Sequence, residues 1–312
     1  MPSSVQKTIL STSDVARLFK VTETTVKRWA DEGTLRCQKT PGGHRKFEIR
    51  NVVDFAEQNH FEPAGSLEIS GDGDPGCRIQ TAVLGRDYPV LVAACVDRVL
   101  APDGNGLLPF FSYLYQHCVQ LWEMHDRVIR PAMDQIGERW SRGEIGISDE
   151  HRASYETLEA LAKLQLQIRI KPRSGRSVVC ATLGDDLHEI GLRCAAYLFE
   201  SEGWESHYLG SRIPAVAVGA AVDQWKPDCV CISSTHGSPA GLRDELRTIA
   251  DAAGRAGAAL LAGGRNAGSL TEVNGIDLTP VSSSHDLLCI IQELDRTAPP
   301  CPGGAGGTMG GS

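Results

Sequence analysis

The chain has 312 residues, 10 of them cysteines, and carries 31 basic and 39 acidic side chains. This length is sufficient for two or three domains that each bury a core. The cysteines form no CxxC pair and no framework typical of secreted domains, and no apolar run is long enough for a signal peptide or a bilayer span. These features argue against secreted and membrane proteins and predict a cytoplasmic protein with reduced thiols.

The charge is unevenly distributed along the chain. Residues 1–60 contain ten Lys or Arg and seven Asp or Glu, a local net charge of +3, so the remainder of the chain carries −11. A small basic segment on an acidic body indicates that any contact with nucleic acid belongs to the N-terminal segment.

Residues 1–60 have the pattern of a small DNA-binding domain. We expect a helix over residues 12–19, capped by one of the hydroxyl residues at 11–13, and a second helix over about 22–32 that ends at Gly33. This is the size of a helix-turn-helix, whose second helix enters the major groove. The residues expected on or beside the outward face of that helix are Thr24, Thr25, Lys27 and Arg28.

A basic hairpin follows the second helix. The segment "LRCQKTPGGHRKFE" predicts two short strands joined by a Pro-Gly-Gly turn, and the turn is followed by His44, Arg45 and Lys46. A hairpin of this kind is a wing that can hold phosphates or a minor groove. The alternative is a small helical interaction module with a solvated charged face. Helix, turn and wing occur together in the right order, which favours binding to double-stranded DNA.

The segment "TSDVARLFKVTETTVKRWADEGTLRCQKTPGGHRKFE" resembles the winged helix of MerR-family transcription regulators. This resemblance implies DNA binding as a dimer on inverted or direct repeats. MerR metal sensors dimerise through one long antiparallel helix, but here a Gly/Pro-rich flexible linker, residues 61–78, occupies its place.

Residues 79–168 predict a helical domain, because their apolar positions recur at helical spacing. The segment "WSRGEIGISDEH" places Trp140 at the end of one helix and Glu150 and His151 in the first turn of the next, which Ser148 would cap. These three side chains are expected to converge across a short loop. The alternative is a core tryptophan and an acid that complements the helix dipole.

Residues 174–298 predict a doubly wound parallel sheet of five strands. Apolar runs such as "SVVCATL", "DCVCISS" and "AALLAGG" alternate with helical patterns, and a weaker fifth strand is expected near "LTPV". The tail, residues 299–312, is low in complexity and is predicted to be disordered. The fold class is therefore a multidomain α and α/β protein: a winged helix, a four-helix bundle and a Rossmann-like domain.

The segment "GDDLHEIG" lies between the first strand and helix of this last domain. Such a turn lies at the carboxyl edge of the sheet, where α/β folds bind ligands. Taken alone, its histidine would be an ordinary polar residue. However, Asp186, His188 and Gly191 resemble the DxHxxG motif of base-off cobalamin-binding domains, which continues with an SxL element and a double glycine. Here 41 residues separate Gly191 from Ser233, and 27 separate Thr235, in place of leucine, from the double glycine Gly263-Gly264.

This resemblance implies that the imidazole of His188 is the lower ligand of cobalt and that Asp186 holds its other ring nitrogen. The nucleotide tail of cobalamin needs a narrow slot, whose walls would be formed by small residues: Ser233, Ser234, Gly263 and Gly264. Without the other motifs, the double glycine would be a plain strand-end turn.

In methionine synthase and corrinoid methyltransferases a four-helix bundle caps the upper face of the cofactor. The W-x9-EH spacing of residues 140–151 is similar to the cap motif of CarH/LitR-type photoreceptors, which bind 5′-deoxyadenosylcobalamin. The resemblance implies that Trp140 shields the upper face of the cofactor and that Glu150 and His151 surround the adenosyl group. In that family the tryptophan is followed by a histidine that becomes the upper cobalt ligand after photolysis, but here this residue is Ser141.

The sequence therefore predicts a cobalamin-dependent, light-responsive MerR-family repressor that is not an enzyme. It would bind operator DNA in the dark as a homo-oligomer, expected to be a tetramer, and would dissociate after light cleaves the cobalt–carbon bond. Two alternatives remain: a corrinoid-dependent methyltransferase or mutase module, and a MerR-type repressor of similar fold that senses another ligand.

Overall fold

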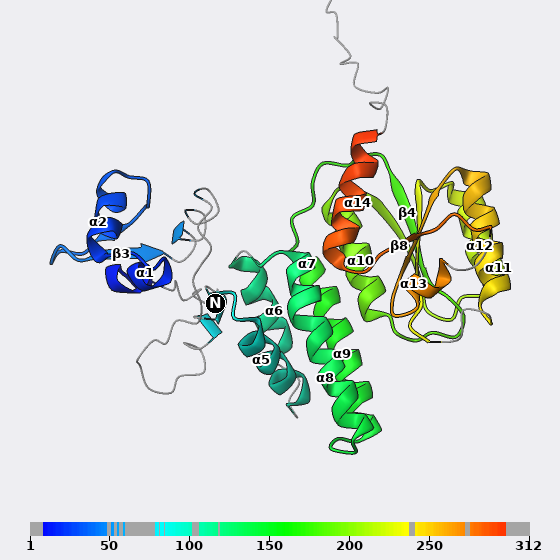
Figure 1. Ribbon diagram of the computed structural model, residues 1–312, viewed down its shortest axis with the longest axis horizontal. Coiled ribbons are helices and arrows are strands. Elements are labelled where there is room, and N and C mark those ends of the chain that lie inside the picture. The colour runs from blue at the N-terminus through cyan, green and yellow to red at the C-terminus, as the bar shows by residue number, and fades with distance from the viewer. Residues whose placement is uncertain are drawn as a thin grey trace, which may run out of the picture. The chain divides into compact units, whose positions relative to one another are not determined.

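The computed structural model describes residues 9–48, 51, 52, 55, 59, 79, 80, 82, 83, 85–101, 106–117, 119–236, 241–271 and 275–297 (Figure 1). The predicted linker and tail lie outside the described residues. The chain divides into two compact units, Met1–Leu164 and Gln165–Ser312.

The N-terminal unit begins with the predicted winged helix. Its elements are β1 (Ile9–Ser11), α1 (Thr12–Leu18), α2 (Glu23–Asp31), β2 (Gln38–Lys39) and β3 (Arg45–Glu48). The strands form an antiparallel sheet in the order β1-β3-β2, so the predicted hairpin is confirmed, and β1 is an addition that the sequence did not predict.

Hydroxyl side chains define where both helices begin. Ser11 Oγ accepts a hydrogen bond from the amide of Asp14 at 3.2 Å, and the Asp14 carboxylate accepts from the amide of Ser11 at 2.9 Å. Thr22 caps α2 by accepting from the amide of Thr25 at 3.3 Å. Phe47 of β3 is fully buried in one core with Val15 and Val26 of the two helices, so the wing packs on the helices.

Four helical stretches follow within residues 88–165, as predicted. They are α5 (Tyr88–Leu100), α6 (Leu107–Gln116), the continuous run of α7 (Leu121–Glu123), the π-helix η1 (Met124–Ile129) and α8 (Arg130–Ser141), and α9 (Ile147–Gln165). Buried apolar residues recur at three- and four-residue spacing, for example Leu91, Cys95 and Val99 of α5, which gives each helix one core face. Arg152 of α9 donates to the carbonyl of Ala101 at 3.0 Å, just after α5.

The C-terminal unit is the predicted five-stranded parallel sheet, with strand order β5-β4-β6-β7-β8. Helices α10 and α14 lie on one face of the sheet and α11 and α12 on the other (Figure 1). Its elements are β4 (Ser177–Thr182), α10 (Ile190–Ser201), β5 (Glu205–Gly210), α11 (Ala215–Trp225), β6 (Cys229–Ser233), α12 (Arg243–Ala256), β7 (Ala259–Gly263), α13 (Ala267–Leu270), β8 (Thr279–Pro280) and α14 (Ser284–Thr297).

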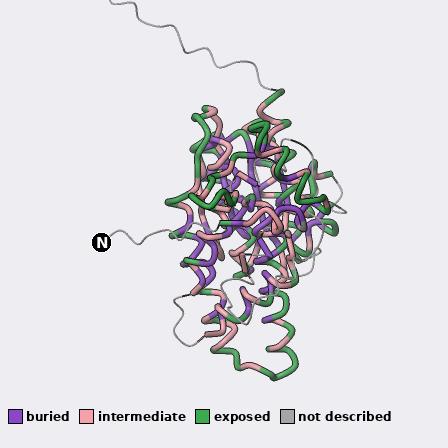
Figure 2. The backbone as a smooth tube through the Cα atoms, turned by 90° about the vertical axis from the view of Figure 1, so that its left-hand side faces the viewer, coloured by how far each residue is buried: buried purple, intermediate pink, exposed green. Residues whose placement is uncertain are grey.

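The central strands β4 and β6 are covered by helices on both faces. All five residues of β6 and five of the six residues of β4 are buried, so both strands read as continuous apolar runs rather than alternating ones. This buried backbone is drawn in purple in Figure 2. The chain leaves β4 toward β5 on one side and returns to β6 on the other. The gap between β4 and β6 is thus the point where strand order reverses, the usual place for a ligand.

No helix among the described residues combines the length and the apolar character that crossing a membrane requires.

Candidate functional site

The carboxyl ends of β4, β6 and β7 bring the predicted sheet-edge residues together. The amide of Leu183 donates to the carbonyl of Ser233 at 2.9 Å, and the amide of Ser234 donates to the carbonyl of Gly263 at 3.0 Å. The strand pairing therefore continues into the loops. The segments that carry DxHxxG, Ser233–Thr235 and the double glycine are neighbours at the reversal point of the sheet.

Asp186 is the centre of this edge and is only 2% exposed. Its Oδ1 accepts from the backbone amide of His188 at 2.9 Å and from His188 Nδ1 at 2.7 Å. Its Oδ2 accepts from the amides of Thr235 and His236, the latter at 3.3 Å. Burial raises the pKa of the Asp186 carboxyl, but the hydrogen bonds from His188 and Thr235 outweigh it and the net pKa is lowered. The carboxylate is therefore an anion that joins the loops after β4 and β6.

The side chain of His188 is 53% exposed although its partner Asp186 is buried. Because Nδ1 donates to Asp186, this tautomer leaves a lone pair on Nε2, the nitrogen that could coordinate a metal. Thr182 Oγ1 donates to the carbonyl of Asp186 at 2.9 Å and holds the loop from the strand below. An oriented, half-exposed imidazole backed by a carboxylate suits the lower ligand of a cobalamin cobalt.

Small residues form the neighbouring wall of the site. Ser234 is fully buried, and Asn266 Nδ2 donates to its Oγ at 3.2 Å. Gly264 has φ +88°, and a Cβ there would lie 2.3 Å from the carbonyl oxygen of Ser234. A side chain at Gly263 would meet nothing closer than the carbonyl oxygen of Ile232 at 4.0 Å. Only glycine fits position 264, whereas a methyl group at position 263 would meet no steric obstacle in the chain itself.

Three other sequence-predicted residues lie on this edge. Ser233 is the last residue of β6 and is 7% exposed. Thr235, which replaces the leucine of the family motif, contributes its backbone amide to Asp186, a contact that does not require leucine. Gly191 lies in the first turn of α10 and is exposed.

His236 was not predicted from the sequence. Its ring lies edge to face against that of His188, with centroids 4.6 Å apart and an interplanar angle of 63°. Its amide also donates to Asp186. A histidine three residues after Ser233, at the end of a strand that reaches the same edge, was the signal that could have indicated it.

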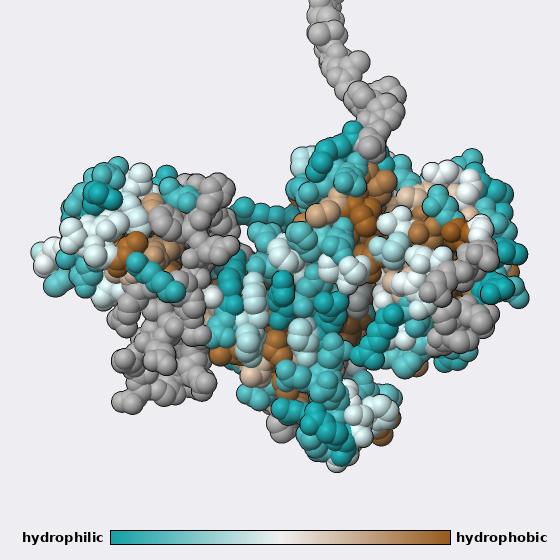
Figure 3. Space-filling view, viewed as in Figure 1, coloured by the Kyte–Doolittle hydropathy of each residue, from teal (hydrophilic) through white to brown (hydrophobic). Residues whose placement is uncertain are grey.

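The predicted cap residues belong to the N-terminal unit. Trp140 lies in the last turn of α8 and is 45% exposed, which contradicts the alternative of a core tryptophan. Glu150 lies in the first turn of α9 and His151 directly after it, with Glu150 Oε2 and His151 Nδ1 2.6 Å apart, and Ser154 Oγ donates to Glu150 Oε1 at 3.1 Å. Ile147, at the start of α9, is also exposed, at 54%, so two large apolar side chains face outward near this connection, on a surface that is otherwise mostly hydrophilic (Figure 3).

The predicted cap of α9 at Ser148 is wrong. A cap at Ser148 would start the helix at Asp149, but it begins two residues earlier, at Ile147, and the carbonyl of Gly146 accepts from the amides of Asp149 and Glu150 at 3.1 and 3.3 Å. The Asp149 carboxylate accepts from the amide of Gly146 at 3.1 Å, so the acid closes this turn instead of the hydroxyl.

The predicted DNA-contact residues lie on α2 and on the wing. Thr24, Lys27 and Arg28 are exposed on α2, whereas Thr25 is half-buried and its hydroxyl lies 3.0 Å from that of Thr22. Lys27 pairs with Glu23 at 3.3 Å and Arg28 with Glu32 at 3.9 Å, each one turn away along the helix. His44 is exposed at the wing turn, followed by the half-buried Arg45 and Lys46. Arg45 differs from expectation because its guanidinium is held by Asp31.

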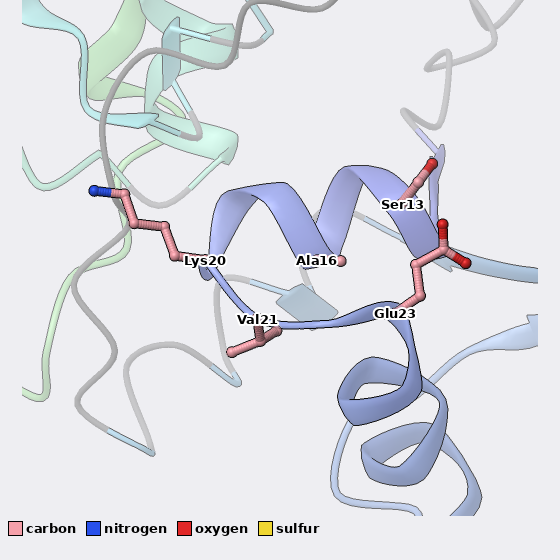
Figure 4. Close-up of a pocket in the computed structure, with 5 residues that line it drawn as sticks. All are labelled: Ser13, Ala16, Lys20, Val21 and Glu23. Carbon is pink, nitrogen blue, oxygen red and sulfur yellow. The ribbon is translucent and has the colours of Figure 1, made fainter.

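A surface pocket at the turn between α1 and α2 contains none of these residues. It is lined by Ser13, Ala16, Lys20, Val21 and Glu23, as Figure 4 shows. Lys20 and Glu23 point away from each other on either side of it, and nothing in this lining resembles the sheet-edge site.

Comparisons with known proteins agree with this arrangement. Residues 9–60 match the model of a helix-turn-helix domain, and residues 95–165 and 176–277 each match a model of a B12 binding domain. The HTH-type transcriptional repressor CarH of Myxococcus xanthus is 32% identical over 248 residues, which span 70% of this chain and 76% of that protein. The chain belongs to the CarH family of B12-dependent transcriptional regulators.

One solved structure supports the fold of the helical and C-terminal regions of this CarH-family protein. The monomethylamine corrinoid protein of Methanosarcina barkeri matches 66% of this chain and 99% of its own length with a TM-score of 0.55 and 14% identity. A cobalamin-binding protein of Desulfitobacterium hafniense covers 71% of this chain and 98% of its own, with a TM-score of 0.34 and 23% identity. The two B12-binding matches support a cobalamin cofactor, as predicted, and the helix-turn-helix match supports DNA binding.

A first prediction concerns DNA binding by this CarH-family chain. Arg28→Ala and Lys46→Ala should each weaken binding to DNA and make its salt dependence shallower by about one unit of slope, because each removes a cation from the DNA-facing surface. Fluorescence anisotropy at several salt concentrations measures both effects. Lys163→Ala, on α9 beside Glu159, is the matched control and should leave both unchanged. If the salt dependence of DNA binding is the same as in wild type for both Arg28→Ala and Lys46→Ala, the DNA-binding surface has been assigned wrongly.

Proposed function

We propose that this CarH-family regulator is a light-responsive repressor that uses 5′-deoxyadenosylcobalamin as its chromophore. In the dark the loaded protein forms an oligomer, a tetramer on this proposal, that binds operator DNA, and light dissociates the oligomer and releases the DNA. The observation that carries the proposal is the pairing of half-exposed His188 with buried Asp186 at the reversal point of the sheet. The repressor activity named for the Myxococcus xanthus relative supports the direction of regulation.

The residues of the sheet edge have separate tasks in this proposal. His188 would hold the cofactor through Nε2, and Asp186 would fix the tautomer of the imidazole and keep it a good donor. Gly264 lets the loop after β7 pack directly against the backbone of Ser234, and Gly263 keeps side-chain bulk away from the place assigned to the nucleotide tail. When bound, adenosylcobalamin supplies a cobalt–carbon bond that light cleaves.

Residues at the α8–α9 end would contact the adenosyl group of the bound cofactor. Trp140 offers a large apolar surface, and the Glu150–His151 pair offers a hydrogen-bonding edge, which together suit a nucleoside such as the adenosyl group. Once the adenosyl group has left, these side chains lose their partner, and the helices that carry them are free to change their packing.

Oligomerisation explains how a change near the cofactor controls DNA binding. Each winged helix contributes a modest affinity that depends strongly on salt. Linking several copies multiplies the total affinity by roughly a hundredfold or more, and dissociation of the oligomer removes that gain.

The decisive experiment compares the dark and illuminated states of the loaded protein. We expect light to change the absorption spectrum, reduce the molar mass measured by light scattering, and weaken binding to a duplex selected by the dark protein. Protein loaded with cyanocobalamin and handled in the same way is the control. A molar mass and a DNA affinity that are the same before and after illumination would reject the proposal.

We also propose that the chain has no enzymatic activity. On this proposal the loaded protein retains one adenosylcobalamin in the dark without turning it over, even when methyl acceptors or mutase substrates are added. Catalytic consumption of such a substrate would favour the methyltransferase or mutase alternative, and a protein that fails to bind any cobalamin would favour a regulator that senses another ligand.

A prediction about the illuminated state follows from Ser141. Its hydroxyl donates to the carbonyl of Glu138 at 2.8 Å, and a neutral hydroxyl is a poor cobalt ligand compared with imidazole. We expect no bis-imidazole spectrum through position 141 after illumination, so that water or another cap histidine fills the upper position. Ser141→His should produce the bis-imidazole spectrum and retain the cofactor more firmly. A bis-imidazole spectrum in wild type that survives separate replacement of His117, His125 and His151 would contradict this expectation.

A further inference from the structure

Asp31 lies at the C-terminal end of α2 and contacts both strands of the wing. Arg45 Nη2 lies 2.6 Å from Asp31 Oδ1 and 2.7 Å from Oδ2, and Lys39 Nζ lies 3.4 Å from Oδ1. Lys39 and Arg45 are direct partners across the β2–β3 hairpin. One carboxylate therefore joins the recognition helix to the two strands of the wing.

The environment of Arg45 differs from that of the other cations on this surface. The side chain of Arg45 is 18% exposed, compared with 48% for Lys27 and 66% for Arg28. Its Nε is buried and donates to no atom of the described residues. A guanidinium enclosed in this way and directed at Asp31 is less accessible to a DNA phosphate than its neighbours are.

The position of Asp31 is electrostatically unfavourable in two respects. An acid in the last turn of a helix opposes the helix dipole, and a negative charge on a DNA-binding domain repels the phosphates. The hydrogen bond from Arg45 holds the pKa of the Asp31 carboxyl below its usual value, so the group is charged at neutral pH. Its cationic partners on the wing offset these costs.

Besides Asp31, strand β2 contacts β3 through backbone pairing and through a hydrogen bond that Gln38 Nε2 donates to Glu48 Oε1 at 3.0 Å, so these contacts lie within the sheet itself. Strand β2 contains two residues, both exposed, whereas β3 is anchored in the core by Phe47. The contacts from Asp31 are therefore in a position to fix the tip of the hairpin, where His44 and Lys46 flank Arg45. A wing that can swing would spread these cations over many orientations and lose affinity for a duplex of fixed shape.

We propose that Asp31 is a positioning residue that braces the wing against the recognition helix, and that Arg45 serves this brace instead of binding phosphate directly. The inference depends on DNA binding by the winged helix and is independent of the cofactor and of light.

The test uses the full-length chain in the cofactor and light condition that gives wild type its highest DNA affinity. The probes are a duplex selected by wild type from a random library and a scrambled duplex of the same composition. Asp31→Asn should bind the selected duplex about fivefold to tenfold more weakly, because it breaks a charge-assisted contact. If net charge alone mattered, Asp31→Asn would bind the duplex more tightly, because it removes one negative charge from the domain.

Glu32→Gln is the matched control. It removes the same charge from the adjacent position and disturbs only the 3.9 Å contact with Arg28, so it should bind both duplexes as tightly as wild type or more tightly. Arg45→Gln should lose about as much affinity as Asp31→Asn, and the double variant should lose no more than either single one. The proposal is refuted if Asp31→Asn binds as tightly as Glu32→Gln. It is also refuted if the losses of affinity in Asp31→Asn and Arg45→Gln add up in the double variant.

Arg45→Lys covers the case in which Asp31→Asn does not fold. It keeps the positive charge but replaces the planar fork by a single ammonium. Weaker binding to the selected duplex, with an unchanged salt slope, supports the brace. Unchanged affinity identifies Arg45 as a simple phosphate contact and overturns the proposal.

Discussion

Replacing His188 with alanine should weaken cobalamin binding by more than about a hundredfold, because the variant removes the side chain that offers a nitrogen to cobalt at the sheet edge. Even the removal of a group that only supports a metal ligand costs about tenfold to a hundredfold in affinity. Equilibrium dialysis against cobalamin gives the affinity, and the absorption spectrum of bound cobalamin reports whether imidazole coordinates the metal.

The variant Asp186→Asn tests the residue that supports His188 while leaving the proposed cobalt ligand itself in place. The amide keeps the shape of the side chain but offers one accepting oxygen in place of two, so it can no longer satisfy both loops. We expect a loss of about tenfold, with the imidazole spectrum retained. An equal loss in both variants would mean that the loops have collapsed, and thermal unfolding of each variant would reveal this.

The neighbouring His236 makes a second variant necessary. Since its ring lies 4.6 Å from that of His188, it is close enough to move into the vacated place. The double variant His188→Ala/His236→Ala excludes that rescue. If this double variant binds cobalamin with wild-type affinity and spectrum, the assignment of the lower ligand is wrong.

The parts of the fold that were predicted correctly depend on local or near-local patterns. The apolar run of residues 177–183 predicted β4 because a strand buried on both faces needs apolar residues throughout. Asp186 and His188 are two residues apart, so their hydrogen bond forms within one turn. The spacing to Ser233 and Gly263 then followed the family pattern, and parallel strand order brought the segments together.

The contacts that were missed join residues distant in the chain. His236 meets His188 across 48 positions, through two loops whose conformations no local pattern specifies. Arg45 and Asp31 are 14 residues apart, and a basic residue on a wing is typical of a phosphate contact until its partner is seen. Strand β1 is three residues long and is stabilised by its pairing with β3, so its own sequence gives too weak a signal.

The residue that caps the N-terminus of α9 could not be assigned from the sequence for a different reason. Gly146, Ser148 and Asp149 all lie where α9 could begin, and serine and aspartate are both favoured there. The hydrogen bonds decide between them: the Asp149 carboxylate accepts from the amide of Gly146 at 3.1 Å, as the third residue of a helix does in a capping box, so α9 begins at Ile147. Such competition between adjacent polar residues shifts the predicted start of a helix by a residue or two.

Gly264→Ala should destabilise the C-terminal unit by about 3 kcal/mol or more and should abolish cobalamin binding, because two costs coincide at this position. The backbone has φ +88°, which an alanine adopts only with strain, and the added Cβ would lie 2.3 Å from the carbonyl oxygen of Ser234 and 2.9 Å from its nitrogen. The obstacle is backbone, so no rotation of a side chain relieves it. Urea unfolding and cobalamin dialysis measure the two effects.

Variants of two other glycines separate the cost of the strained backbone from the effect of added bulk at the end of β7. Gly257 has φ +69°, and a Cβ added there would have nothing within 4 Å, so Gly257→Ala should cost only the backbone strain, about 1 kcal/mol, and leave cobalamin binding unchanged. Gly263 has an ordinary φ and the nearest neighbour of an added Cβ is at 4.0 Å, so Gly263→Ala should fold normally. It should nevertheless weaken cobalamin binding, because its methyl group would enter the space assigned to the nucleotide tail.

Two outcomes would contradict these expectations. If Gly263→Ala binds cobalamin as tightly as wild type, the nucleotide tail does not pass this strand end. A Gly264→Ala variant as stable as Gly257→Ala would show that the loop after β7 can move away from Ser234.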